Sequence, residues 1–350
     1  MGDRPKTVLA KQLSEEDAEA FDAFVRASPF AACQQTRAWA ENAPRSRRHD
    51  YLHFLCRDAR AEPIGAAIVR RSRLAPGASL ATLQRGPVID NPAHLGTVLE
   101  ELKKVLRAAG FCSLVLAPRA AGEARVPFAA ALARYGFHPL PAASQALHTV
   151  TGKISLLGSE EEMLARFKQR GRRAIRKVAE SGVSVRRASD ADLPACAELL
   201  AAFHARRPGY DSGGQFGVAA QARLIASEGG ALLVAEQDGR IVGWHSFVRQ
   251  GRSALWLGLA TDDDAQAPRS YLLLWEAMRA ARVLGLESYD LAGLAADGEE
   301  TGRDQFKQAF APEREELLPA HVAALRPLRH VIFFRARQAY RSWRQRQRGL

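Results

Sequence analysis

Apolar and polar positions follow the same pattern in two separate stretches of the chain. Each stretch carries apolar residues at helical spacing, reaches a glycine, and continues at once into an alternating strand. Val98–Ala117 aligns with Leu273–Ala292 without a gap. The pairs Glu101/Glu276, Arg107/Arg282, Gly110/Gly285, Ser113/Ser288, Leu116/Leu291 and Ala117/Ala292 are identical. The pattern predicts one α/β unit that occurs twice.

A second repeated block lies upstream of each copy. Tyr51–Arg57 with Ile64–Arg70, and Ala231–Glu236 with Arg240–Val248, each read as a strand, a turn and a strand. Any helix, glycine and strand in succession look somewhat alike, so chance similarity is the alternative interpretation. Two blocks in the same order favour duplication. We therefore expect two similar domains with a cleft between them.

Shorter periodic segments predict the remaining elements. Helices are expected around Glu15–Ala27, Pro92–Ala109, Pro127–Tyr135, Leu193–Arg206 and Gly217–Ala226, and strands at Lys153–Leu157 and Val183–Arg187. Ser159 with Glu162 forms a capping-box pattern at the start of a basic helix. We expect a first domain over residues 1–150, a second over 151–310, and a C-terminal segment, 311–350, that packs back on the first.

Composition narrows the class of protein. The chain has 350 residues, of which 47% are hydrophobic, enough for a core in each half. Neither a membrane-spanning apolar run nor a secretory signal is recognisable, so a cytoplasmic protein is expected, with the inner face of the membrane as an alternative. The four cysteines show neither metal-ligand nor disulfide spacing, and no metal or cofactor is predicted. They are Cys33, Cys56, Cys112 and Cys196.

The formal net charge of +12 favours polyanionic partners. The charge is clustered in the basic helix, where no acid occurs from Arg166 to Lys177. An anion-facing role is favoured over an ordinary solvated face, which normally mixes signs. The cations concerned are Lys168, Arg170, Arg172, Arg173, Arg176 and Lys177.

The C-terminus is a second basic stretch. Arg326–Arg348 holds eight arginines interleaved with apolar and aromatic residues. Such a segment can make a peripheral contact with a membrane or with phosphates. The alternative is a closing helix whose apolar stripe packs on the first domain.

Mixed strands with a helix after the third or fourth, twice over, suggest two tandem domains of the N-acetyltransferase-like (GNAT-like) α/β fold, with mixed sheets flanked by helices. Acetyl-CoA enzymes of this fold use a glycine-rich loop before the main helix, because glycine lets backbone N–H groups approach the pyrophosphate. The corresponding segments here, Asp262–Ser270 and Asp90–His94, contain no glycine and carry acids. Acetyl-CoA binding in the usual way is therefore not expected.

Five segments occur in an order that resembles the Fem family of aminoacyl-tRNA-dependent transferases, which build peptidoglycan interpeptide bridges. They are Gln34-x-x-x-x-Trp39, Arg85-Gly-Pro-Val-Ile-Asp90, Arg172–Val183, Tyr271–Tyr289 followed by Asp290-Leu-Ala-Gly293, and Phe306-Lys307-x-x-Phe310. The resemblance implies an aminoacyl-tRNA donor whose 3′ end approaches the second domain. It also implies a nucleotide- or lipid-linked muropeptide acceptor on the side of the first domain.

The resemblance also implies catalytic roles. Lys307 would lie by the scissile ester or the terminal adenosine and stabilise the oxyanion. Asp90 would orient the acceptor amine or accept its proton. The alternatives are an ordinary surface lysine and, for Asp90, a helix N-cap. The cations of the basic helix would contact tRNA.

Further residues are expected at the acceptor. Arg206 or Arg207, with Tyr210, resembles the element that grips the precursor's phosphates, for which the planar guanidinium is suited. Where the family often has a lysine after Trp39, this chain has Ala40-Glu41. Either Arg37 or Arg45 substitutes for it, or the acceptor is not a nucleotide-linked muropeptide. The resemblance implies that Trp256 lies in the strand whose aromatic residue lines the family's substrate channel, with a core tryptophan as the alternative. Arg85 and Phe306, in the Arg-Gly-Pro-Val-Ile-Asp and Phe-Lys motifs, are expected to bind substrate. His204 and His245 are expected to be structural.

The sequence therefore predicts an aminoacyl-tRNA-dependent aminoacyl or peptidyl transferase. One alternative is a GNAT-type N-acyltransferase that acts on a cell-envelope glycan or lipid from a CoA or carrier-protein donor. The other is a non-catalytic module that binds RNA or membrane through its basic stretches. Affinity for CoA would favour the first alternative, and RNA binding without acyl transfer the second.

Overall fold

The computed structural model describes residues 5–75, 78–141, 144–145, 147–206, 216–262, 268–295 and 302–332. The chain forms two compact units. Unit 1 comprises residues up to 40, residues 45–147 and the C-terminal part from 317, and unit 2 comprises residues 41–44 and 148–316. Each unit is described by itself below.

Unit 1 is built on a mixed sheet in the order β1-β2-β3-β4-β6-β15-β7, with β5 paired to β3. The strands are β1 (Lys6–Ala10), β2 (His49–Arg57), β3 (Pro63–Ala75), β4 (Ala78–Arg85), β5 (Val88–Ile89), β6 (Phe111–Pro118), β7 (His138–Pro139) and β15 (His321–Ala324). The helices are α1 (Glu15–Ala27), α2 (Arg37–Asn42), α3 (Leu95–Ala108) and α4 (Arg125–Arg134). Because strand side chains alternate, Leu55 and Ile68 pack against α1, whereas Phe54 and Val69 join the core under α3 and α4.

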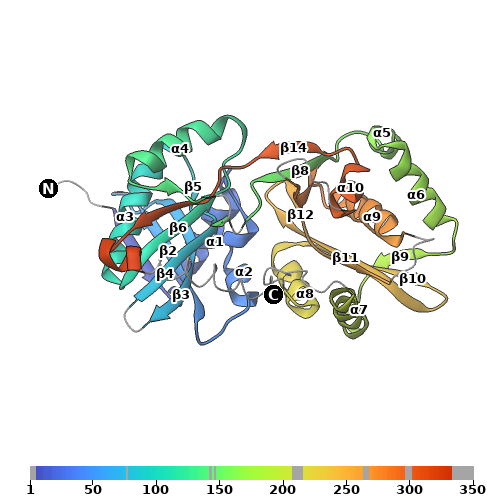
Figure 1. Cartoon of the computed structure of the whole chain (residues 1–350), viewed down its shortest axis with the longest axis horizontal. Helices are drawn as coiled ribbons and strands as arrows, with labels where there is room; N and C mark the ends of the chain where they lie inside the picture. Colours follow the sequence, from blue (N-terminus) through green and yellow to red (C-terminus); the bar gives the residue numbers. More distant parts are fainter. Residues whose placement is uncertain are drawn as a thin grey trace, which may run out of the picture. The chain divides into compact units, whose positions relative to one another are not determined.

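Unit 2 repeats this plan with the sheet β14-β8-β13-β12-β11-β10-β9. Its strands are β8 (Val150–Ser155), β9 (Ser184–Arg187), β10 (Gly230–Gln237), β11 (Arg240–Gln250), β12 (Ser253–Thr261), β13 (Ser288–Gly293) and β14 (Glu313–Glu316). The helices are α5 (Glu160–Arg166), α6 (Gln169–Ala179), α7 (Leu193–Ala205), α8 (Val218–Glu228), α9 (Arg269–Val283) and α10 (Gly302–Gln308). Helices α5, α6 and α9 cover one face of this sheet, and α7 and α8 the other (Figure 1).

The predicted repeat corresponds to α3 with β6 and α9 with β13. In each unit the helix ends at a glycine with positive φ, Gly110 at 88° and Gly285 at 72°, a conformation that glycine adopts without strain. The following strand then pairs in parallel, β6 with β4 and β13 with β12. Together with the antiparallel hairpins β2–β3 and β10–β11, this confirms the predicted fold class.

Each sheet also receives one strand from across the sequence. β8 follows β7 in the chain, yet lies between β13 and β14 in the sheet of unit 2. β15 follows β14, yet lies between β6 and β7 in the sheet of unit 1. The two exchanged strands occupy corresponding positions, as expected for a duplicated unit.

Two predicted helices need correction. The segment expected to be one helix over 92–109 begins as a 3-10 turn, Pro92–His94, and continues as α3. Its cap is Asn91, whose side chain accepts from the backbone N–H of Ala93, so Asp90 is not the N-cap.

The basic helix is two helices, α5 and α6, separated by extended backbone at Phe167 and Lys168. The Phe167 ring is 2% exposed and packs edge-on against Trp275 and Phe310. Burying that ring redirects the chain.

Gly171 allows α6 to lie against the segment after α10. A Cβ atom at Gly171 would come within 2.7 Å of the backbone oxygen of Ala309. Gly→Ala inside a helix normally stabilises by about 0.5–1 kcal/mol. Here we expect Gly171→Ala to lower the free energy of unfolding by about 1–3 kcal/mol through overpacking.

Chemical denaturation of the Gly171 variant measures this effect. Gly302→Ala is the matched control, because no atom lies within 4 Å of the corresponding Cβ position in α10. Equal stabilities of the two variants would contradict the close packing of α6 at Ala309.

Candidate active site

The two parallel strands of unit 2 separate where those of unit 1 stay together. β12 and β13 pair at Ser253/Ser288, Ala254/Tyr289 and Leu255/Asp290 and then part, although β12 continues to Thr261. In unit 1, β4 and β6 stay paired from Ser79/Phe111 to Arg85/Pro118. Ligands of α/β sheets bind at the carboxyl ends of parallel strands, particularly where neighbouring strands diverge. The parting of β12 and β13 therefore marks a candidate site.

Lys307 bridges the parted strands. Its Nζ atom donates to the backbone oxygen of Gly293 on β13 at 2.6 Å and lies 5.2 Å from the ring centroid of Trp256 on β12. The residue is 4% exposed, so it is not the ordinary surface lysine of the alternative interpretation. Burial, with a contribution from Arg303, lowers the pKa of Lys307 to about 8. A buried ammonium with one carbonyl partner can stabilise developing negative charge.

The backbone that holds Lys307 is shaped by two carboxylates. Asp290 accepts from the Thr151 hydroxyl and, at 2.8 Å, from the backbone N–H of Ala292, which has a φ of 58°. Asp304 accepts from the backbone N–H of Ala295 at 3.0 Å. Both carboxylates also favour the charged form of Lys307. The Asp290-Leu-Ala-Gly293 motif thus forms a turn that presents the Gly293 carbonyl to the ammonium.

Aromatic side chains cluster beside Trp256, whose ring lies next to the ammonium. Phe306 packs edge-on against Trp256 and Tyr271, with ring centroids 6.1 and 4.8 Å apart. All three rings are half-buried. Such rings can stack with a nucleobase or line a narrow substrate path. The structure brings the predicted residues Trp256, Phe306 and Lys307 together.

His245 supports this cluster from within the sheet. It is completely buried, its Nε2 atom lies 2.6 Å from the Tyr289 hydroxyl, and its ring packs edge-on against Trp256 at 4.9 Å. Burial lowers the pKa of His245 to about 3, so the imidazole is neutral at physiological pH. It adds no second positive charge beside Lys307.

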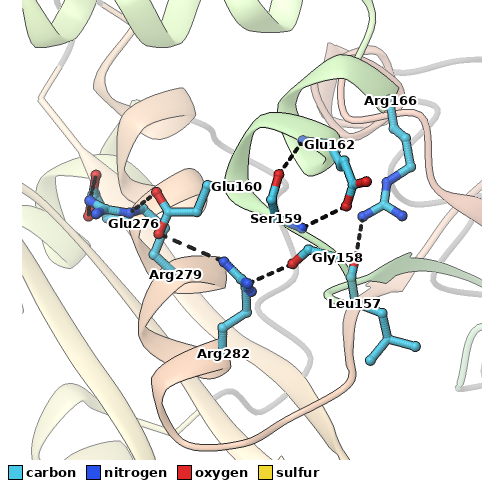
Figure 2. Close-up of polar contacts among 9 residues, drawn as sticks. All are labelled: Leu157, Gly158, Ser159, Glu160, Glu162, Arg166, Glu276, Arg279 and Arg282. Atoms are coloured by element: carbon cyan, nitrogen blue, oxygen red, sulfur yellow. Dashed lines mark hydrogen bonds and ion pairs between the residues drawn. The ribbon is translucent and has the colours of Figure 1, made fainter.

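Helix α5 is anchored to α9 at its first turn. Ser159 and Glu162 form the predicted capping box. Arg279 of α9 pairs with Glu160, and Arg282 donates to the backbone oxygen of Gly158 at 2.6 Å (Figure 2). Arginines on one helix and carboxylates at the N-terminus of the other thus fix the orientation of the basic segment.

Helix α6 lies beside the Lys307 segment. The backbone N–H of Lys168 donates to the backbone oxygen of Ala309 at 3.0 Å, and Arg170 donates to the backbone oxygen of Gln305. Arg172 donates to the backbone oxygens of Ala165 and Phe167 at the end of α5. Arg170 and Arg172 therefore also have structural roles, which sequence reasoning did not predict.

The remaining cations of α6 extend outward. Arg173, Arg176 and Lys177 are exposed, and their side chains make no hydrogen bond or ion pair with any described residue. They are the members of the predicted tRNA-binding set, with exposed Lys168, that offer charge to a ligand.

We expect Arg173→Gln/Arg176→Gln to weaken tRNA binding and to reduce the dependence of log affinity on log salt by about 0.7 for each phosphate that the helix no longer neutralises. Filter binding across a salt series measures the slope. Arg240→Gln, an exposed arginine at the start of β11, is the control and should leave the slope unchanged. A wild-type slope in the double variant would exclude this face of α6 as the RNA contact.

Asp90 in unit 1 has a partner that the sequence did not reveal. Its Oδ1 atom lies 2.7 Å from Nδ1 of His94, and both side chains are exposed at 42% and 39%. A carboxylate on one ring nitrogen orients an imidazole and leaves the other nitrogen to exchange protons. The spacing of four residues was the available signal, because Pro92–His94 forms one turn.

The other predicted residues of unit 1 are engaged in the fold. Arg37 is held in a bidentate ion pair with Asp22 of α1, with Nη2 to Oδ2 at 2.6 Å. Arg85 is 5% exposed, which leaves little surface for a ligand. Arg45 is exposed and donates to the backbone oxygen of Ala40 at 3.3 Å. Of the two proposed substitutes for the family's lysine, Arg45 has the more accessible guanidinium.

Arg206 lies at the C-terminus of α7 in unit 2. Its guanidinium donates to the backbone oxygen of Thr261 at 3.0 Å, at the end of the parted strand β12. The predicted partners Arg207 and Tyr210 lie outside the described residues. Arg206 is therefore the phosphate candidate that the structure positions.

The start of α9 differs from a diphosphate-binding loop. Arg269 is 6% exposed and donates to Asp262 and to Gln237, each at 2.7 Å. The cation nearest the N-terminus of this helix is thus neutralised within the protein. Residues 263–267 lie outside the described residues, so the expectation that acetyl-CoA is not bound in the usual way stays a prediction.

The described residues contain no group of three or more His, Cys, Asp or Glu side chains suited to a metal ion. Within the same residues, the helices are too short or too polar to cross a bilayer.

Comparisons with known proteins agree with this geometry. Residues 165–308 match the model of the acetyltransferase (GNAT) domain, and residues 16–126 match the model of the FemAB family. No curated protein sequence matches the chain.

The chain is similar in fold to many solved structures, including the three that follow. The crystal structure of FemX has a TM-score of 0.79 and 16% identity, covering 93% of this chain and 99% of that one. The C-terminal domain of a putative lysylphosphatidylglycerol synthetase from Agrobacterium fabrum has a TM-score of 0.53 and 15% identity, with coverages of 89% and 92%. A tandem GNAT protein from the clavulanic acid pathway has a TM-score of 0.50 and 13% identity, with coverages of 92% and 99%.

Parted parallel strands at the candidate site and the GNAT-domain match define an acyltransferase built from two GNAT-like units. The FemAB match over residues 16–126 and the FemX-like fold support a Fem family protein with GNAT-like domains.

Proposed function

We propose that the protein transfers an aminoacyl group from aminoacyl-tRNA to an amine, most simply that of a peptidoglycan-precursor peptide. The observation that carries this proposal is the buried ammonium of Lys307 between β12 and β13, directly beside the basic helix α6. A polyanionic donor would contact α6, and its 3′ end would reach Lys307. Charged tRNA and nucleotide-linked precursors place the reaction in the cytoplasm, and a lipid-linked acceptor would place it at the inner membrane face.

The chemistry requires little besides positioning and electrostatics. The acceptor amine attacks the ester carbonyl, a tetrahedral oxyanion forms, and the ribose oxygen leaves as the amide forms. Because the ester is already activated, the steps to assist are amine deprotonation and stabilisation of negative charge. Lys307 is suited to the second step, since its ammonium is desolvated and fixed by the Gly293 carbonyl.

Several of the predicted residues would hold the acceptor. Arg206 or Arg207 would bind the phosphates of a nucleotide- or lipid-linked muropeptide, and Arg45 would add a further cation. Asp90, through His94, would accept the amine proton. The half-buried rings of Trp256 and Phe306 would line the path of the donor's 3′ end.

An N-acyltransferase that uses acyl-CoA is the second candidate, because the GNAT-domain model matches unit 2. The neutralised Arg269 at the start of α9 argues against it, since a diphosphate would find no free cation at that position. The two donors can be distinguished directly.

The test incubates the protein with a pool of radiolabelled aminoacyl-tRNA and a soluble precursor pentapeptide linked to its nucleotide, and in parallel with radiolabelled acetyl-CoA. We expect label from tRNA in a base-stable amide, with no product from acetyl-CoA. Lys307→Met serves as the inactive control. Transfer from acetyl-CoA, or loss of the tRNA ester only at the rate of spontaneous hydrolysis, would overturn the proposal.

A further inference from the structure

The last described residues of unit 1 are helical, and their apolar side chains face solvent. Residues 327–332 are helical, and Leu328, Val331 and Ile332 are 83%, 45% and 69% exposed. At about 100° per residue, positions 328, 331 and 332 share one face of a helix. The sequence alternative, a closing helix over Arg326–Arg348 with its apolar stripe packed on the first domain, does not describe Leu328, Val331 and Ile332, and residues 333–348 lie outside the described residues.

The opposite side of the same helix is attached to unit 1. Nδ1 of His330 lies 2.9 Å from the Ser113 hydroxyl of β6, and position 330 is about 150° from the centre of the apolar face. Just before the helix, Arg326 donates to the backbone oxygen of Arg107 at 3.1 Å, and Arg107 donates to the backbone oxygen of Leu325 at 3.0 Å. The helix is thus held with its apolar residues outward.

A basic pocket begins at the same anchor. Four cations and one acid line a surface pocket of about 450 Å³ between α3 and α4: Lys103, Lys104, Arg107, Arg134 and Glu100. Arg107 belongs both to this pocket and to the attachment of the C-terminal segment. Burial, with a contribution from Arg107, lowers the pKa of Lys103, as expected for neighbouring cations.

We propose that this face of unit 1 binds an anionic lipid bilayer, with Leu328, Val331 and Ile332 entering the interface and the pocket cations contacting lipid phosphates. From residue 317 onward the sequence contains eight arginines and neither Asp nor Glu. Trp343 and Tyr340, which suit a membrane interface, lie in the same stretch. Apolar anchors flanked by arginines are typical of interfacial helices, and anionic lipids supply the matching charge.

Other occupants fit less well. A second copy of the chain would bring arginine-rich surfaces together, because a two-fold interface uses the same patch on both subunits. RNA offers phosphates to the arginines but no partner to three exposed aliphatic side chains. The inference goes beyond the proposed function, since membrane binding would occur whatever acyl group the enzyme transfers.

Sedimentation of the full-length protein with sucrose-loaded vesicles tests the inference. We expect binding to vesicles containing phosphatidylglycerol and much weaker binding to pure phosphatidylcholine. Leu328→Asp/Ile332→Asp should reduce binding to the anionic vesicles at least about tenfold. Val283→Asp, at an 84% exposed valine of unit 2, is the control and should bind as the wild type. Lys104→Gln/Arg134→Gln should lose about fivefold per cation on anionic vesicles only.

Three results would overturn the inference. One is equal binding by the wild type and the Leu328/Ile332 variant. Another is a wild-type dimer in light scattering that dissociates in this variant, without vesicle binding. The third is an equal loss of tRNA affinity in the variant, which would make the segment an RNA contact. Aminoacyl transfer to a soluble acceptor should be unchanged in the variant, so failure of this inference is separable from failure of the proposed function.

Discussion

Lys307→Met should lower turnover by about 10²–10³-fold while acceptor affinity stays nearly constant. That loss is typical when a preorganised donor to a developing oxyanion is removed. Methionine keeps most of the buried alkyl chain, so the core around Trp256 and Phe310 loses little packing. Lys307→Ala should show the same kinetic loss with a larger decrease in stability. Single-turnover kinetics with saturating aminoacyl-tRNA measure the effect on chemistry.

A matched lysine distinguishes this role from a general effect of charge. Lys153 on β8 is paired with Glu315 at 2.6 Å and is partly exposed in the same unit. Lys153→Met should retain turnover within about threefold. If Lys307→Met also stayed within threefold of the wild type, the ammonium would have no part in the reaction, and the site would have to be sought elsewhere.

The pH dependence of the reaction rate follows from the burial of Lys307. Burial lowers the pKa of Lys307 to about 8, so the ammonium is lost as the pH rises through that value and the rate should fall on the alkaline side. Arg303, an exposed neighbour, contributes to the lowering. Arg303→Gln should therefore raise the pKa of Lys307 and move the alkaline limb to higher pH. If the alkaline limb of the pH–rate profile does not move in this variant, the limb reports another group, such as the tRNA ester itself.

Much of the fold was predictable because its signals are local. The helix, glycine and strand pattern at Gly110 and Gly285 requires a left-handed residue at one position, and the capping box at Ser159 uses groups three residues apart. Motif order along the chain predicted Lys307 as a site residue and strand position predicted Trp256, and the structure places the Lys307 Nζ atom 5.2 Å from the Trp256 ring centroid. These features depend on neighbours in sequence or on a pattern that spans the whole family.

The features that sequence reasoning missed depend on long-range packing. The break between α5 and α6 arises because the ring of Phe167 is buried against α9 and Phe310, which no periodicity reveals. Arg37 is paired with Asp22 across two helices, so an arginine expected at the acceptor is held on α1. The return of the C-terminal segment to unit 1 was predicted, but the place of β15 between β6 and β7 and of β8 between β13 and β14 leaves no mark on alternation, since each strand keeps its own apolar face.

Substitutions at the Asp90–His94 pair should give the second large effect, and the test separates a loss of catalysis from a loss of stability. Because Asn91, not Asp90, caps the following turn, Asp90→Asn should leave thermal stability unchanged. A positioned base contributes about 10²–10⁴-fold to proton transfer, so we expect Asp90→Asn and His94→Gln each to lower turnover at least about 10²-fold with little change in the apparent Michaelis constant for the acceptor.

The two residues should act as one unit. If Asp90 orients the imidazole and His94 carries the proton, the double variant should be no slower than either single variant, because the second change removes a function already abolished by the first. His138→Gln, an exposed histidine of the same unit, is the control and should have wild-type turnover. Multiplicative losses would show that Asp90 and His94 act independently. If both single variants kept turnover within about threefold of the wild type, neither residue would accept the proton, and the amine would lose it to solvent. Unit 1 would then only bind the acceptor.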